Sequence, residues 1–177
     1  MPNTIYVVEG EIEQRFLGQL IHCDWVQPGV VRKFNLMQES MKSSNYILTK
    51  RYDKIFCIID TNCADKSNCE KLSSNVRLLK SIGKVFVLVQ HENFEDELQY
   101  MVNEPLGRFF GLRHHSTADV KKHLAQSVDY SSFITKGHLL RYGTRSGDFV
   151  KRFGSSGYKL GQNQLVDGSA LLVKGWR

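Results

Sequence analysis

The sequence lacks a long apolar run, and its first residues do not predict a secretion leader. A membrane-spanning helix needs about 20 mostly apolar residues in succession, and no stretch of the chain approaches that length. The N-terminal residues lead directly into a strand-like segment, without the basic region and apolar stretch that make up a signal peptide. We therefore expect a cytoplasmic protein that does not associate with membranes.

Cysteine is scarce, and its spacing does not suit a metal centre. None of the four cysteines belongs to a Cys-x-x-Cys pair, whereas structural zinc sites require four ligands with recognisable spacing. Cys63 and Cys69 are separated by five residues, and the histidines lie far from them in the sequence. The pattern does not support zinc binding, and it predicts free thiols, as is usual without a secretion signal.

What the chain does have is enough apolar content for a core. At 177 residues with 41% apolar residues, it suits one compact domain or one core with an extension. The charge is unevenly distributed, because residues 1–103 contain 12 Lys and Arg against 13 Asp and Glu, whereas residues 104–177 contain 12 against 5. We therefore divide the chain into a core, residues 1–103, and a basic C-terminal extension, residues 104–177. Carboxylates that hold a metal ion and cations that neutralise phosphates would together suit nucleic acid, although a solubilising surface explains the charge equally well.

Short apolar segments alternate with helix-like segments in the first part of the chain. Four of the apolar segments predict buried β-strands: Thr4–Val8, Val30–Phe34, Lys54–Ile59 and Lys84–Val89. Three intervening stretches with helical spacing of apolar residues predict helices: Glu11–Ile21, Glu39–Leu48 and Cys69–Ile82. This order predicts the α/β class, with a mainly parallel four-stranded sheet flanked by helices.

The pattern changes after the fourth strand. Phe94–Val102 has helical spacing, and a capped helix is expected to start at Ser116 and run towards Gln126. The segment Leu165–Trp176 predicts a hairpin of two short strands around Asp167 and Gly168. The extension is therefore expected to be of the α+β type.

Two acidic residues follow predicted strands. Glu9 ends the first strand and Asp60 ends the third, and functional groups of open α/β sheets gather at the carboxyl ends of strands. If the two strands lie close together, the carboxylates point into one crevice and offer the hard oxygen ligands that Mg²⁺ requires. The alternative is that each acid only caps the start of a helix.

The residues around these acids resemble a known family. Residues 7–13 (VVEGEIE) and 58–62 (IIDTN) are similar to the Toprim domain of topoisomerases, primases, small RNA-maturation nucleases and OLD-family nucleases. The repeated acid, Glu9 with Glu13, is more similar to the OLD or RloB-like branch than to the primases. The resemblance covers roughly residues 4–100 and implies an acid–base or metal-ordering role for Glu9 and Mg²⁺ ligation by Asp60.

The chain departs from the family pattern at Asn62, which occupies the position of the second acid in the family's Asp-x-Asp pair. An amide oxygen coordinates Mg²⁺ without supplying charge, so Glu13, Asp65 or an acid after the fourth strand would have to compensate. Glu95, in the acidic segment 91–98, is the candidate third carboxylate. The alternative for Glu95 is a solvated acid at a helix start. The departure leaves open either one-metal catalysis or an inactive descendant.

The extension mixes cations, aromatics and glycines. Cations neutralise phosphate, and aromatic faces can stack unpaired bases. For any single aromatic a core position is the favoured interpretation, whereas the segment as a whole favours contact with nucleic acid. The candidate nucleic-acid-binding residues are Lys121, Lys122, Arg141, Arg145, Lys151, Arg152 and Lys159.

These observations give two main hypotheses, beside a third, a small-nucleotide or regulatory enzyme that uses the same crevice, against which the basic extension argues. The first is a Mg²⁺-dependent (or Mn²⁺-dependent) Toprim-type nuclease that hydrolyses phosphodiester bonds of DNA or RNA. Its catalytic residues would be Glu9, Asp60 and Glu95, and its metal ligands Glu9, Asp60, Asn62 and Glu13. The second is an inactive Toprim-like module that binds nucleic acid or a protein. Because some Toprim proteins work beside an ATPase, the resemblance also implies that a partner such as an ATPase subunit is possible.

Overall fold

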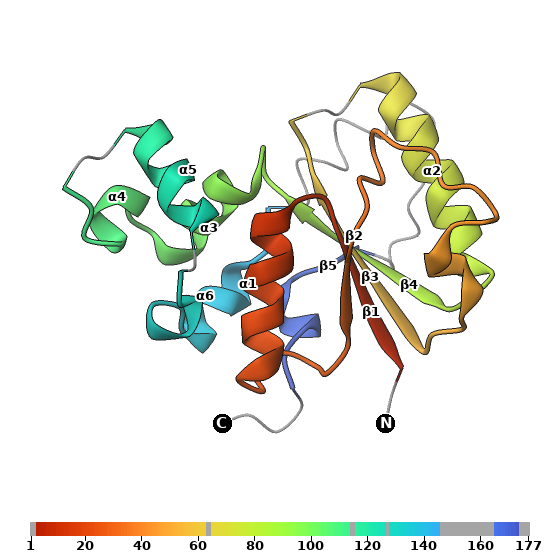
Figure 1. The fold of residues 1–177 in the computed structure, drawn as a ribbon, viewed down its shortest axis with the longest axis horizontal. Coiled ribbons are helices and arrows are strands. Elements are labelled where there is room, and N and C mark those ends of the chain that lie inside the picture. The colour runs from red at the N-terminus through yellow and green to blue at the C-terminus, as the bar shows by residue number, and fades with distance from the viewer. Residues whose placement is uncertain (1–2, 63–64, 114–115, 127, 146–164, 174–177) are drawn as a thin grey trace.

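The structure is a computed structural model of the chain, and it describes residues 3–62, 65–113, 116–126, 128–145 and 165–173. Within these residues, five parallel strands form one sheet in the order β2-β1-β3-β4-β5 (Figure 1). The strands are β1 (Thr4–Val8), β2 (Val30–Lys33), β3 (Lys54–Asp60), β4 (Lys84–Gln90) and β5 (Leu165–Val166). The predicted α/β class with a parallel sheet is confirmed, and β5 adds a strand to the four that were expected.

Helices cover both faces of the sheet. The described α-helices are α1 (Glu11–His22), α2 (Lys66–Lys80), α3 (Phe94–Val102), α4 (Leu106–Phe109), α5 (Thr117–Ala125) and α6 (Lys136–Arg141). Short 3₁₀ turns occur at Tyr46–Thr49, Tyr130–Ser132 and Gly168–Ala170. α2 packs on one face, while α1 and the helices that follow β4 pack on the other (Figure 1).

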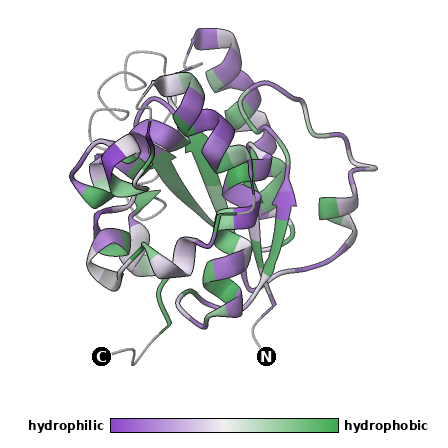
Figure 2. Ribbon diagram, turned by 60° about the vertical axis from the view of Figure 1, so that its left-hand side comes forward, coloured by the Kyte–Doolittle hydropathy of each residue, from purple (hydrophilic) through white to green (hydrophobic). Residues whose placement is uncertain are grey.

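β1, β3 and β4 are mostly apolar because both of their faces are buried. In β1, Tyr6 and Val8 belong to the core under α1, whereas Ile5 and Val7 belong to the core under α2. The same alternation runs through β3 and β4, and Figure 2 shows green, hydrophobic strands in the interior, beside helices that carry both purple and green residues. A continuous apolar run is the expected pattern of a strand that is covered on both sides.

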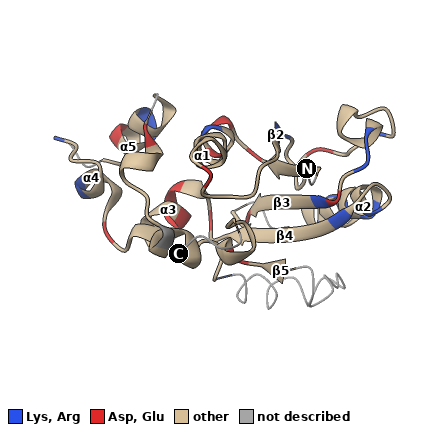
Figure 3. Cartoon of the chain, turned by 90° about the horizontal axis from the view of Figure 1, so that it is seen from below, with Lys and Arg blue, Asp and Glu red and all other residues tan. Residues whose placement is uncertain are grey.

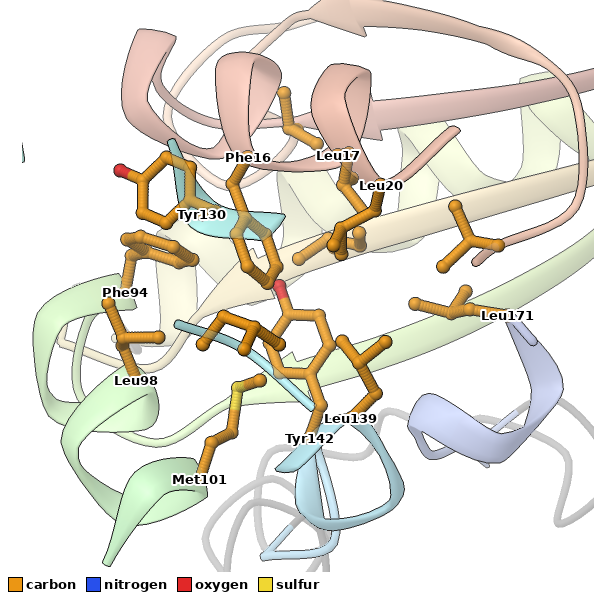
Figure 4. Packing of buried hydrophobic residues seen from close by; sticks show 14 of the residues in the cluster. Phe16, Leu17, Leu20, Phe94, Leu98, Met101, Tyr130, Leu139, Tyr142 and Leu171 are labelled. Atoms are coloured by element: carbon orange, nitrogen blue, oxygen red, sulfur yellow. The ribbon is translucent and has the colours of Figure 1, made fainter. Parts of the chain in front are cut away.

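The C-terminal part of the chain completes the core under α1. Phe16 of α1 contacts the rings of Phe94, Tyr130 and Tyr142 at centroid distances of 5.2, 5.1 and 6.0 Å (Figure 4). The guanidinium of Arg15 donates to the backbone oxygens of residues 124, 125 and 126, where α5 ends. Residues on both sides of position 103 therefore share one hydrophobic core.

The predicted helix Glu39–Leu48 is wrong. Apart from the 3₁₀ turn Tyr46–Thr49, this segment has no helix in the described structure. The buried side chain of Asn75 in α2 accepts from the Met41 backbone N–H at 2.8 Å and donates to the backbone oxygens of Leu36 and Glu39. Because Asn75 satisfies these backbone groups, the segment can lie irregularly against α2 without a helical hydrogen-bond ladder.

The predicted C-terminal hairpin is also wrong. Leu165 and Val166 pair with β4 in parallel, and the chain then forms the turn Gly168–Ala170. Gly168 permits this route, because a Cβ at that position would collide with the Leu139 backbone oxygen. The backbone N–H of Gly168 donates to the backbone oxygen of Tyr142 at 2.6 Å. At the position where the sequence predicted the turn of a hairpin, the chain therefore packs closely against the end of α6.

Candidate active site at the ends of β1 and β3

The strand order reverses at β1, because β2 lies on one side of β1 and β3 lies on the other. In open α/β sheets, such a switch point opens a crevice outside the carboxyl ends of the strands, where ligands bind. Glu9 directly follows β1, and Asp60 is the last residue of β3. The two strands pair directly, so the structure brings together the two acids that the sequence singled out.

Glu9 is held by groups from both neighbouring strands. Its Oε1 accepts the backbone N–H of Asp60 at 3.2 Å, and its Oε2 accepts the side-chain amide of Asn35, which lies just beyond β2, at 3.1 Å. Asp60 is 9% exposed, and its Oδ1 has no hydrogen-bond partner among the described residues. A buried carboxylate oxygen without a partner is costly, and a cation would relieve that cost.

The acids of this crevice repel one another. Burial raises the pKa of Asp60 to about 9, and the charges of Glu9, Glu13, Glu95 and Glu97 add to this rise. Burial also raises the pKa of Glu9 to about 7, and Glu13 adds to it, while hydrogen bonds from Asp60 and Asn35 oppose the change. Figure 3 shows the acidic first turn of α3 in red, on the side of the sheet that carries α1.

Glu13 has a structural contact of its own. It lies in the first turn of α1 and is buried, and the backbone N–H groups of Gly10 and Glu13 hydrogen-bond to its carboxylate. This is one half of a capping box. Gly10 accommodates the arrangement, because a Cβ there would lie 2.5 Å from Oε2 of Glu13. The capping role and the charge that Glu13 adds to the crevice therefore occur together.

The loops after β3 and β4 are tied to each other. The backbone N–H groups of Thr61 and Asn62 both donate to the backbone oxygen of Glu92. In return, the backbone N–H of Glu92 donates to the Thr61 hydroxyl at 2.7 Å. Asn62 is exposed at this rim. Glu95 is half-buried in the first turn of α3, close enough to add to the repulsion on Asp60.

Sequence reasoning gave little weight to Glu97, which is the most deeply buried acid near the site. It is fully buried, and it accepts the His91 N–H at 2.9 Å and the Gly143 N–H at 2.6 Å. Burial raises its pKa, while these two backbone donors oppose the rise. The helical spacing with Phe94 and Met101 could have indicated an inward direction, but an acid in a first helical turn is usually solvated.

The donor chemistry of the crevice fits a hard divalent cation. Among the described residues, no group of three or more His, Cys, Asp or Glu side chains is arranged to hold a metal ion. Mg²⁺ does not require such a group, since it usually keeps several waters and binds through one or two carboxylates plus substrate phosphates. The unpartnered Oδ1 of Asp60 is the group that best fits this kind of ligation.

The structure separates the predicted basic residues into two sets. Arg141 and Arg145 both lie over the ring of Tyr100, with guanidinium carbons 4.7 and 4.9 Å from its centroid. Lys121 and Lys122 are exposed on α5. Three further candidates lie outside the described residues, namely Lys151, Arg152 and Lys159.

Comparison with known proteins adds no relative. No protein-family model, curated protein or solved structure matches this chain. The site must therefore be interpreted from its own geometry. In the part of the chain that the structure covers, no helix is both long and apolar enough to cross a membrane. Cys23 and Cys57 are free thiols.

Proposed function

We propose that the chain is a Mg²⁺- or Mn²⁺-dependent nuclease of the Toprim type, which hydrolyses phosphodiester bonds of nucleic acid. The observation that carries the proposal is the meeting of Glu9 and Asp60 at the switch point of the sheet, with an unpartnered buried oxygen on Asp60. Raised pKa values that arise from burial and from neighbouring charges are common at catalytic sites.

Each acid has a separate role in this proposal. Asp60 holds the cation, with Asn62 and Glu95 at the rim as further oxygen donors. When bound, the cation supplies Lewis-acid polarisation of the phosphate and neutralises its developing charge. Glu9, whose pKa is raised to about 7, is suited to proton transfer near neutral pH. As water adds to phosphorus, Glu9 accepts its proton, and a proton is returned to the leaving alcohol oxygen when the phosphorus–oxygen bond breaks.

The cationic residues position the strand. Arg141 and Arg145 lie on α6 and just beyond it, in the segment joined to Glu97 through Gly143. Lys121 and Lys122 extend the positive charge along α5. Contacts of this kind neutralise phosphates without reading sequence, so binding is expected to weaken as salt is raised.

The test is cleavage of single-stranded and double-stranded DNA and RNA, with Mg²⁺, Mn²⁺ or EDTA. Glu9→Gln and Asp60→Asn are each expected to lower the rate by roughly 10²–10⁴-fold. The matched control is Glu70→Gln, which changes an exposed residue of α2 on the other face of the sheet from α1. This variant should cleave like wild type. Equal cleavage by wild type and Glu9→Gln would exclude the proposed role of Glu9.

A second candidate function is a nucleic-acid-binding module without catalysis. The specific observation in its favour is the exposed amide at Asn62, which supplies no charge where the resemblance expects a second acid. This candidate predicts salt-sensitive binding that EDTA does not change. Asn62→Asp separates the two candidates, because a gain of metal binding or cleavage indicates a weakened active site.

A further inference from the structure

The last residues of β3 and β4 lie side by side at the carboxyl end of the sheet. Asp60 and Gln90 are partners in the parallel register of these two strands. Ile58 and Leu88, two positions earlier, belong to the core under α1. Because side chains alternate along a strand, Asp60 and Gln90 point to that same face, and their side chains are neighbours there.

Both side chains have a buried oxygen without a hydrogen-bond partner. Asp60 is 9% exposed and Gln90 is completely buried, and neither Oδ1 of Asp60 nor Oε1 of Gln90 has a partner among the described residues. One atom is a carboxylate oxygen and the other an amide oxygen, so both are acceptors and neither can satisfy the other. Burying two unpartnered acceptors is costly, and a cation that binds both oxygens would remove this cost.

Tyr142 fixes the orientation of the Gln90 amide. Its hydroxyl accepts the Nε2–H of Gln90 at 2.7 Å, which leaves Oε1 available to another ligand. Figure 4 shows the Tyr142 ring beneath α1, with its hydroxyl among the buried side chains. Burial raises the pKa of Tyr142, and the charges of three acids, Asp60 included, add to the rise. The hydroxyl therefore lies close to the acidic crevice as well as to Gln90.

The C-terminal part of the chain holds Tyr142 in place. Tyr142 directly follows α6, and its backbone oxygen accepts the Gly168 N–H at 2.6 Å. The next residue, Gly143, donates its N–H to the buried carboxylate of Glu97. A side chain that is fixed in this way can orient a metal ligand, as the hydrogen-bond partners of metal ligands commonly do.

We propose that Gln90 is a ligand of the divalent cation, through Oε1 beside Oδ1 of Asp60, and that Tyr142 is its positioning residue. The proposal rests on the proposed function, since the cation is the one assigned there to Asp60. An amide oxygen is a hard ligand that suits Mg²⁺ or Mn²⁺. Because it is neutral, it adds coordination without adding to the repulsion among the acids, and it does so from inside the fold, whereas Asn62 and Glu95 lie at the rim.

The experiment measures Mn²⁺ binding at pH 8 without nucleic acid, from the loss of the electron paramagnetic resonance signal of free Mn²⁺. Gln90→Met is similar in length and removes the amide oxygen, so Mn²⁺ affinity should fall by roughly 10–100-fold. Tyr142→Phe removes only the hydroxyl and should lower the affinity by roughly tenfold. The matched control, Gln99→Met, makes the first change at an exposed position of α3 and should bind Mn²⁺ like wild type.

The double variant separates positioning from a general structural role. Because Tyr142 acts through Gln90, Gln90→Met combined with Tyr142→Phe should bind Mn²⁺ no more weakly than Gln90→Met alone. This variant also removes the hydroxyl that Gln90→Met leaves without its amide partner, so it replaces the single variant if the latter does not fold. Additive losses in the double variant would exclude the positioning role of Tyr142.

Gln90→Glu gives an independent measurement, because it keeps an oxygen ligand and adds a charge beside Asp60. Its unfolding temperature in EDTA should be lower than that of wild type, owing to the repulsion between like charges. Millimolar Mn²⁺ should then raise the unfolding temperature by more than it does in wild type. A variant that Mn²⁺ stabilises no more than wild type would contradict ligation by residue 90.

Wild-type Mn²⁺ affinity in Gln90→Met, or tighter binding, would overturn the assignment, since an amide that donates to Asp60 competes with the cation. If Asp60→Asn still abolished Mn²⁺ binding and Mg²⁺-dependent cleavage, the nuclease proposal would stand without Gln90. Mn²⁺ binding that depends on Gln90, in a protein that cleaves no nucleic acid, would instead support the ligand and exclude the nuclease. Wild type that binds no Mn²⁺ would also overturn the assignment of Gln90.

Discussion

Oε1 of Glu9 accepts the backbone N–H of Asp60 at 3.2 Å, so the acid that follows β1 is attached to the last residue of β3. The bond leaves the Asp60 side chain unattached, and its buried Oδ1 has no partner in the described structure. A cluster of acids that repel one another, with one oxygen unpartnered, lowers the stability of the metal-free protein. A functional role for these acids would explain why the protein has an arrangement that lowers its stability.

Replacing Asp60 by asparagine should stabilise the metal-free protein while removing cleavage. The amide has nearly the same shape and carries no charge to repel Glu9, Glu13 and Glu95, which contribute to the raised pKa of Asp60. At pH 8 we expect the free energy of unfolding to rise by about 1–2 kcal/mol. Urea denaturation in EDTA measures this change. A destabilised Asp60→Asn variant would contradict the account of the crevice as a strained acidic cluster.

Stability of the metal-free protein should fall as pH rises. The pKa of Glu9 is raised from 4.5 to about 7, and that of Asp60 from 3.8 to about 9. Their protonated forms favour the folded state, so this contribution is complete below about pH 4 and is lost as pH rises towards about 9. Thermal unfolding in EDTA between pH 5 and pH 9 measures the slope.

The unfolding measurements across pH have an internal control. Asp60→Asn should flatten the pH dependence relative to wild type, because it removes the group with the larger shift. Millimolar Mn²⁺ should raise the unfolding temperature of wild type at pH 8 more than at pH 5, since a bound cation replaces the protons. An identical slope in wild type and Asp60→Asn would show that Asp60 does not carry this effect.

Glu97→Gln should destabilise the protein although glutamine is nearly isosteric. One amide oxygen can accept from only one of the two N–H groups, those of His91 and Gly143, that the carboxylate now satisfies. The other N–H would face a donor, at a cost of about 1–3 kcal/mol. Chemical denaturation measures the loss, with Asp96→Asn at an exposed position on the same helix as the comparison. Wild-type stability in Glu97→Gln would exclude the proposed structural role of Glu97 as the shared acceptor for His91 and Gly143.

Asn75→Ala should loosen the irregular segment that precedes β3. Asn75 satisfies three backbone groups of that segment, including the Met41 N–H. Leaving buried groups without partners costs about 1–3 kcal/mol each, so hydrogen exchange at the Met41 amide should accelerate. Ser74→Ala, an exposed neighbour on α2, should not change that exchange. Unchanged protection of Met41 in Asn75→Ala would contradict the assigned role.

The parts of the fold that depend on local pattern could be predicted from the sequence. Apolar runs covered on both faces identified β1, β3 and β4, and the position of Glu9 and Asp60 after such runs predicted that they would meet. The irregular segment against α2 could not be predicted in this way, because it depends on Asn75, a polar residue distant in sequence. The short strand β5 likewise depends on an edge of β4 that only the folded sheet provides.

The site was predicted unevenly for a similar reason. Strand ends locate Glu9 and Asp60, whereas the roles of Glu97 and Tyr100 depend on contacts with residues 141–145, which follow them by more than one helix. Residue type alone suggested solvent exposure for Glu97, but its two backbone partners allow complete burial.

The pairing of Leu165 with Val87 has a consequence for synthesis of the chain on the ribosome. β4 has an open edge until residues 165–166 emerge, and the core under α1 is incomplete until first Tyr142 and then Leu171 have been synthesised. Nascent chains that stop near residue 103 would therefore present an apolar face and unpaired backbone amides, which favour association with other chains. Fragments of this length should need chaperone binding or should precipitate, even though they contain both acids of the candidate active site.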